Sequence, residues 1–161
     1  MRLALIQPRS ASVAEEQRNV DDALDWLSRA ADAGADLVVF PECYPGPANP
    51  ANSYDAMPRL AERAAELKLH VIASRIEPAD EQHHYVTLHL IDDSGATVGV
   101  YRRTTPGGPY VYRDIPAWDF DYTCADNELP VFETRLGRIG MLVCSEVYMP
   151  ELSRVLALKG A

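Results

Sequence analysis

The stretch RLGRIGMLVCSEVYMPELSR, Arg135 to Arg154, predicts a buried strand followed by a helix, with the thiol of Cys144 between them. A strand followed by a helix is the pattern of an α/β fold. The apolar run Ile139 to Val143 predicts the strand, and the spacing of apolar residues after Pro150 predicts the helix. Cys144 stands at the junction, and the ends of strands are where α/β sheets usually build their sites. No histidine lies near Cys144 in sequence, so a reactive thiol here would need a base from elsewhere in the chain.

Upstream of this stretch, strands and helices alternate in the same way. LALIQP, residues 3–8, predicts a buried strand, a helix follows from about Val13 to Ala33, and ADLVVF, residues 35–40, predicts a second strand. Ser12 and Glu15 have the spacing of a capping box ahead of the helix. A strand, a helix and a strand at this spacing predict a βαβ crossover and a parallel pairing of the two strands.

The remaining elements complete an α/β pattern. A second helix is predicted at about Tyr54 to Leu67, followed by a strand over LHVIASR, residues 69–75. Residues 84–103 alternate around a DDSG turn and predict a β-hairpin, and residues 129–144 resemble another. The sequence therefore predicts a mixed sheet with helices against it and hairpins at one side.

One connection is longer than usual. Residues 104–128 form an irregular stretch rich in glycine, proline and aromatic side chains, and connections of this length are usually functional or disordered. The aromatic content favours an ordered loop that lines a pocket. The aromatic residues in question are Tyr110, Tyr112, Trp118, Phe120 and Tyr122.

Composition excludes several classes of function. The chain has 161 residues, a net charge of −9 and an isoelectric point near 4.8, which argue against nucleic acid or an anionic membrane as a partner. No apolar run is long enough to span a bilayer, and the first residues do not resemble a signal peptide. The three cysteines form no CxxC pair, so a reducing, cytoplasmic location is expected.

Three chemically useful side chains follow predicted strands. Glu42 comes just after the second strand, Arg103 ends the first hairpin, and Cys144 ends the last strand. If these ends converge, the carboxylate would accept the thiol proton, and the cation would favour the thiolate and stabilise an oxyanion. The sequence thus predicts Glu42 as the general base that the thiol requires.

The segments VVFPE, GVYRR and GRIGMLVCSEVYMPELSRVLALKGA resemble the three signature segments of the nitrilase superfamily, the carbon–nitrogen hydrolases. Their order matches the family's, and the resemblance covers essentially the whole chain. It implies an α-β-β-α sandwich and a thiol hydrolase that cleaves a non-peptide C–N bond, in a small amide or nitrile, through a thioester. Within it, Glu42 corresponds to the base, Cys144 to the nucleophile, and the backbone N–H of Ser145 to part of the oxyanion hole.

The resemblance also implies that no cofactor or metal is needed, and that the chain forms a homo-oligomer with the segment Tyr148 to Leu158 as the candidate contact. The other expected partner is a complementing chain that covers the sheet face left exposed by an incomplete sandwich. A second family carboxylate lies between the cation and the cysteine, and its candidates here are Asp119, Asp121 and Glu128. His83, His84 and His89 are close in sequence but do not predict a metal site, because positions 84 and 89 face opposite sides of a strand.

Two features depart from the family pattern. The family's catalytic lysine corresponds to Arg103, and the two lysines of the chain, Lys68 and Lys159, lie elsewhere. Arginine keeps the charge but does not deprotonate in proteins. Residues 1–161 are also expected to form one domain that is truncated relative to the family, and an incomplete sandwich leaves an apolar sheet face to be covered.

These departures keep a rival interpretation open, in which the chain is a catalytically silent relative with an assembly or binding role. A third interpretation is a redox protein of flavodoxin-like shape. It predicts that Cys144 cycles with Cys43 or Cys124.

Overall fold

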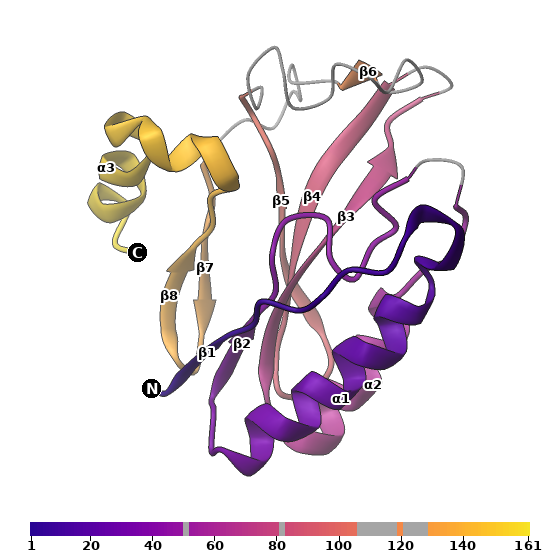
Figure 1. Ribbon diagram of the computed structural model, residues 1–161. Coiled ribbons are helices and arrows are strands. Elements are labelled where there is room, and N and C mark those ends of the chain that lie inside the picture. Colours follow the sequence, from indigo (N-terminus) through magenta and orange to yellow (C-terminus); the bar gives the residue numbers. More distant parts are fainter. Residues whose placement is uncertain (50–51, 81–82, 106–118, 121–128) are drawn as a thin grey trace.

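The computed structural model describes residues 1–49, 52–80, 83–105, 119–120 and 129–161 (Figure 1). Its main sheet has the strand order β1-β2-β3-β4-β5, formed by Leu3–Leu5, Leu37–Val39, His70–Pro78, His83–Ile91 and Thr97–Arg102. The first three strands are parallel, and β3, β4 and β5 pair antiparallel. The short β6, Asp119–Phe120, pairs with β4. The predicted parallel crossover and the predicted hairpin are both present.

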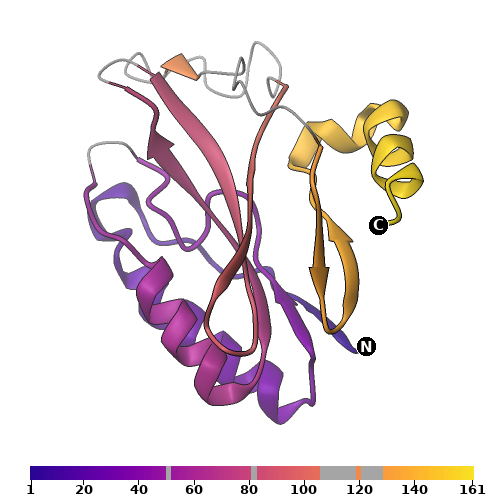
Figure 2. The same ribbon diagram turned by 180° about the vertical axis from the view of Figure 1, so that it is seen from behind.

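Two helices cover one face of this sheet (Figures 1 and 2). The helix α1 spans Arg18–Asp32 and α2 spans Met57–Leu67. Their apolar sides pack on alternate residues of the strands, as the period of two along a strand requires. This core contains Leu27, Leu60, Val38, Val71 and Ala73, all buried.

The opposite face of the sheet packs against a second, smaller sheet. The strands β7, Val131–Thr134, and β8, Gly137–Gly140, form the hairpin predicted from the sequence. The backbone of Gly99 on β5 lies so close to Phe132 that a Cβ at that position would stand 2.7 Å from the ring. Beyond the hairpin, helix α3, Pro150–Leu158, packs Leu156 against Gly140. The layers are therefore α-β-β-α, which confirms the predicted fold class.

Two helix starts differ from the sequence prediction. Val13–Glu15 forms a separate 3-10 helix, η1, and α1 begins only at Arg18. The predicted capping box is absent, since the Ser12 side chain makes no capping bond and the Glu15 carboxylate pairs with Arg18. The second helix begins at Met57 rather than Tyr54, because the Asp55 carboxylate caps the Met57 N–H at 2.9 Å.

The strand that leads to Cys144 is shorter than predicted. It ends at Gly140, and residues 141–143 run without strand pairing to the 3-10 helix η2, Cys144–Tyr148. The Val143 N–H donates to the Glu146 carboxylate at 2.8 Å instead of to a neighbouring strand. Among the helices in the described residues, none is long and apolar enough to cross a membrane.

Candidate active site

Glu42 is positioned by the end of β2. Beyond Val39 the chain stays attached to β3, because the Phe40 N–H donates to the Ile72 carbonyl at 2.9 Å. Two residues later the chain turns, with Cys43 in the left-handed region at φ +55°. The turn leaves the Glu42 carboxylate partly exposed beyond the C-terminal end of β2, with 23% of its side chain accessible.

Arg103 follows β5 directly, and its N–H donates to the Val86 carbonyl at 2.9 Å. Its side chain is fully buried, although a guanidinium is rarely buried unless it is paired. Nη1 donates to Glu42 Oε1 at 2.6 Å, and Nη2 donates to Ser145 Oγ at 2.5 Å. Nε donates to the Thr105 carbonyl at 2.7 Å. The arginine therefore links the Glu42 turn to the segment that carries Cys144.

Cys144 begins η2 with φ +50°, in the left-handed backbone region that residues other than glycine rarely adopt. Such strained residues cluster at functional sites. Burial and the negative charge of Glu42, which accepts a hydrogen bond from the thiol, raise the pKa of Cys144. The Ser145 backbone N–H and the Arg103 charge act in the opposite direction and lower the pKa, but they are outweighed.

This balance modifies the expectation from the sequence, in which the cation would favour the thiolate. The thiol of Cys144 is held in its protonated form, with the Glu42 carboxylate as the acceptor of its hydrogen bond. A carboxylate within hydrogen-bond reach of a thiol has the geometry of a general base beside a nucleophile. The structure brings Glu42, Arg103 and Cys144 together as predicted, although Cys144 follows β8 only after the unpaired residues 141–143.

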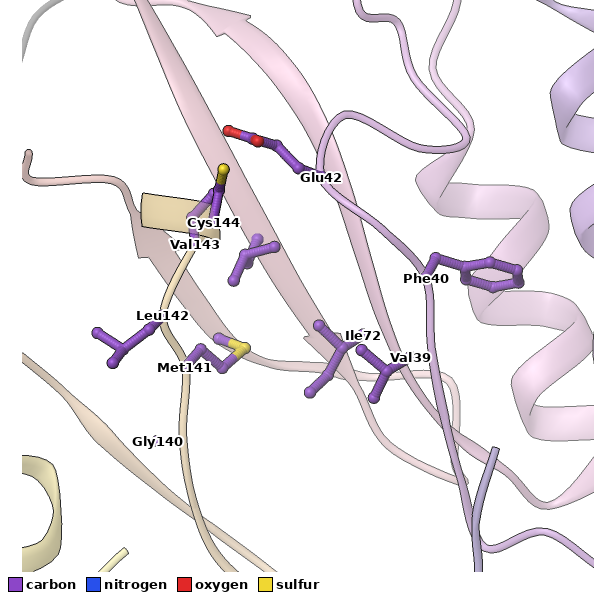
Figure 3. Close-up of a pocket in the computed structure, with 10 residues that line it drawn as sticks. Val39, Phe40, Glu42, Ile72, Gly140, Met141, Leu142, Val143 and Cys144 are labelled. Atoms are coloured by element: carbon purple, nitrogen blue, oxygen red, sulfur yellow. The ribbon is translucent and has the colours of Figure 1, made fainter. Parts of the chain in front are cut away.

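A pocket of about 220 Å³ adjoins this cluster, between the main sheet and the segment after β8. Figure 3 shows Glu42 and Cys144 pointing toward each other at one end, with Val39, Ile72 and Met141 farther into the pocket. Apart from Glu42 and Cys144, its described lining consists of apolar residues and Gly140. These lining residues are Val39, Phe40, Ile72, Leu88, Gly140, Met141, Leu142 and Val143.

Sequence reasoning missed Glu146, whose side chain is completely buried. Its Oε1 accepts hydrogen bonds from the Tyr101 hydroxyl at 2.9 Å and from the Thr104 N–H at 2.9 Å. Its Oε2 accepts the Val143 N–H. Glu146 lies within the segment around Cys144 that resembles a family signature, so that segment contained the signal.

Several predicted residues are not part of this cluster or lie outside the described residues. Tyr110, Tyr112, Trp118, Asp121, Tyr122, Cys124 and Glu128 lie outside them, as do the side chains of Asp119 and Phe120. Burial and the neighbouring Glu42 raise the pKa of the Cys43 thiol far above the usual range, so this thiol is not expected to be reactive. Among the described side chains, no group of three or more His, Cys, Asp and Glu residues could hold a metal ion.

A second polar cluster lies on the helix-covered side of the main sheet. His89 Nε2 and Arg75 both bond the Glu77 carboxylate, at 2.9 and 2.8 Å, and the Thr87 hydroxyl donates to it at 3.0 Å. Burial alone would raise the pKa of Glu77, but the bonds to His89 and Arg75 outweigh it and lower the pKa to about 2. This cluster is a structural ion-pair network that joins β3 to β4.

Comparison with known sequences gives relatives that are hydrolases of C–N bonds. An N-carbamoylputrescine amidase of Arabidopsis thaliana is 29% identical over 154 residues, covering 86% of this chain and 50% of the relative. An omega-amidase of Homo sapiens is 26% identical, covering 99% of this chain and 60% of the relative. A nitrilase of Bradyrhizobium diazoefficiens is 29% identical, covering 92% of this chain and 51% of the relative. The chain thus spans about half the length of most of these relatives.

Solved structures give the same result. An amidase from Nesterenkonia sp., in a mutant form with the acetamide moiety of fluoroacetamide added covalently at its active-site cysteine, superposes with a TM-score of 0.81 at 25% identity. The match covers all of this chain and 62% of the amidase chain. A sequence profile of the carbon–nitrogen hydrolases matches residues 2–161. The chain therefore belongs to the carbon–nitrogen hydrolase family, the nitrilase superfamily.

Proposed function

We propose that this chain is a thiol hydrolase that cleaves the C–N bond of a small amide, with Cys144 as nucleophile and Glu42 as general base. The observation that carries the proposal is the hydrogen bond from the Cys144 thiol to the Glu42 carboxylate at the mouth of an apolar pocket. Because the thiol rests protonated, proton removal by Glu42 accompanies the attack rather than preceding it.

The reaction then proceeds in two halves. Glu42 takes the thiol proton as the sulfur bonds to the carbonyl carbon, and the developing oxyanion is stabilised by the Ser145 N–H and the charge of Arg103. The C–N bond breaks as protonated Glu42 gives its proton to the nitrogen, so ammonia or an amine leaves. Glu42 next activates a water molecule, which attacks the thioester, releases the carboxylic acid and restores the thiol.

An amide is the favoured substrate class, and a nitrile is the alternative within the same chemistry. Two of the three relatives described above are named as amidases, and the third as a nitrilase. The small pocket with apolar walls favours an uncharged acyl group of a few carbon atoms. The whole chain, as one domain of 161 residues, is proposed to supply this site.

One observation favours a second candidate, a catalytically silent chain with a binding or assembly role. Arg103 stands where the family has its lysine, and its three donor nitrogens are already engaged by Glu42, Ser145 and Thr105. A guanidinium cannot give up a proton in a protein. Arg103 therefore cannot take part in proton transfer as a lysine could, which favours the silent chain.

The proposed partner besides the substrate is a second copy of this chain, bound through the segment Tyr148 to Leu158, or a complementing chain that covers the exposed sheet face. Val147, Tyr148 and Leu158 support this, since their apolar side chains are strongly exposed on η2 and α3. The proposed location is the cytoplasm, supported by three cysteines without a paired spacing. Light scattering of Tyr148→Glu tests the contact between copies. If this contact holds the assembly together, the variant should have a lower molar mass than the wild type.

The test of the enzyme is ammonia release from a panel of short primary amides and nitriles. Cys144→Ser and Glu42→Gln are each expected to lower the rate by about 10²-fold or more. Glu133→Gln serves as a carboxylate control, because its side chain is 82% exposed at the far hairpin, and its rate should equal that of the wild type. Turnover that survives in Cys144→Ser contradicts the assignment of the nucleophile.

The variant Arg103→Lys separates the two candidates. A rate that rises in this variant identifies a slow enzyme limited by its arginine. If neither the wild type nor a folded Arg103→Lys releases ammonia from any compound, the silent-chain proposal replaces the enzyme proposal.

A further inference from the structure

The buried carboxylate of Glu146 joins the two segments that carry the reacting groups. From the end of β5 it accepts the Tyr101 hydroxyl, the Thr104 N–H and the Thr104 hydroxyl, at 2.9, 2.9 and 3.1 Å. From the segment before the nucleophile it accepts the Val143 N–H at 2.8 Å. Thr104 is the neighbour of Arg103, and Val143 is the neighbour of Cys144. One side chain therefore holds both neighbours.

All four of these contacts come from hydrogen-bond donors, which matches the acceptor-only chemistry of a carboxylate. A buried charge is tolerated where such bonds satisfy it. Glu146 is also the third residue of η2, and its bond to the Val143 N–H satisfies a donor at the start of that helix. The same bond fixes the chain on the N-terminal side of Cys144, whose backbone is in the strained left-handed region.

A second link runs in parallel with Glu146. The Arg103 guanidinium bonds Ser145 Oγ, so the β5 end and the η2 segment are connected on both sides of the cysteine. The link through Ser145 joins two side chains, whereas the Glu146 link includes two backbone N–H groups. Backbone groups determine where the segments lie relative to each other.

We propose that Glu146 is a positioning residue, whose carboxylate fixes the place of the Cys144 thiol relative to Arg103 and Glu42. It touches none of the reacting atoms of the proposed hydrolysis and acts through the two backbone segments that it binds. For hydrolysis this inference rests on the proposed function. For the environment of the thiol it stands on the hydrogen bonds alone.

The experiment measures the rate of Cys144 alkylation by iodoacetamide against pH, by peptide mass spectrometry, in the folded full chain. Burial and the contact with Glu42 raise the pKa of Cys144 in the wild type. In Glu146→Gln the amide nitrogen is a donor and cannot accept both sets of donors, so the thiol should move away from Glu42. Its profile should shift toward that of an ordinary thiol with a pKa of about 8.5.

The expected change is alkylation about three- to tenfold faster at pH 8 in Glu146→Gln, since each pKa unit changes the thiolate fraction about tenfold. Tyr101→Phe removes one donor and keeps the ring, so it should shift the profile in the same direction by less. Thr87→Val is the matched control, because it also removes a buried hydroxyl donor from a carboxylate, Glu77, on the other side of the sheet. The control should keep the wild-type profile.

Unchanged alkylation profiles in folded Glu146→Gln and Tyr101→Phe overturn the inference, and so does an equal shift in Thr87→Val. If Glu146→Gln does not fold, the alkylation profile of Tyr101→Phe is compared with that of Thr87→Val. A shift in Tyr101→Phe alone supports the role of Glu146, and no difference overturns it. Hydrolysis is measured on the same samples, where kcat should fall more than KM rises. A wild type without hydrolysis refutes the proposed function, whereas the alkylation profiles still decide the role of Glu146.

Discussion

Replacing Arg103 by lysine should destabilise the chain although the positive charge is kept. The arginine side chain is fully buried and donates three hydrogen bonds in three directions, from Nη1, Nη2 and Nε. Lysine has one nitrogen at the end of a shorter stem, with no donor at the Nε position. The lysine nitrogen should pair with the carboxylate of Glu42, so the acceptor oxygens of Ser145 and Thr105 lose their hydrogen-bond donor.

The magnitude follows from these two lost bonds. A hydrogen bond to a charged group contributes about 1.5–3 kcal/mol. Ser145 and Thr105 are only partly buried, so water can replace part of the loss, and the lower end of the range applies to each. The free energy of unfolding should therefore fall by about 2–4 kcal/mol. For a chain of this size that corresponds to a Tm lower by roughly 4–16 °C.

The assay is urea unfolding followed by circular dichroism, with the slope of the free energy against urea as a check that both variants unfold alike. Arg138→Lys is the matched control, because Arg138 is half exposed and lies 3.8 Å from Glu133. Its effect should stay within about 0.5 kcal/mol. If Arg103→Lys is as stable as Arg138→Lys, the three bonds do not hold the site together and the reasoning is refuted.

Three further predictions concern the thiol, the acid limit of stability and the packing of the two sheets. Glu42→Gln removes the negative charge that raises the pKa of Cys144, so alkylation at pH 8 should become faster while hydrolysis becomes slower; parallel changes in both rates would contradict this. The pKa of Glu77 lies below its ordinary value of 4.5, at about 2, so its contribution to stability is present above pH 4.5 and is lost as the pH falls toward 2. At pH 3 about 2 kcal/mol should be gone, and urea unfolding of Glu77→Gln should show no such loss. Gly99→Ala places a Cβ 2.7 Å from the Phe132 ring and should destabilise the chain by about 1–3 kcal/mol. Unfolding of the double variant with Phe132→Ala should show less than the sum of the two single losses, and strict additivity would argue against the contact.

The alternation of elements could be predicted from the sequence because burial on one face sets the period of apolar residues. The strands at β2 and β3 and the helix at α2 follow this rule. Glu42, Arg103 and Cys144 converge because they come shortly after β2, β5 and β8. The helix starts and the end of β8 could not be predicted. They depend on which hydrogen-bond partner each backbone N–H finds, such as the Asp55 and Glu146 carboxylates.

The protonation state of the thiol was also beyond the sequence. A cation and a carboxylate near a cysteine have opposite effects on its pKa, and only distances and burial decide which of them prevails. The structure places the carboxylate in a hydrogen bond with the thiol and engages the cation with Glu42 and Ser145. The buried Glu146 could have been selected from the motif, yet its role depends on donors from β5, far away in sequence.

If Cys144 is the nucleophile, it becomes acylated during turnover, and mass spectrometry of the full chain, quenched in acid during incubation with a small primary amide, measures this directly. We expect an added acyl mass on the peptide that contains Cys144, with Cys43 and Cys124 unmodified. In Cys144→Ser the thioester should be absent. Consumption of the amide by a chain whose Cys144 stays unmodified throughout the time course would show that Cys144 is not the nucleophile.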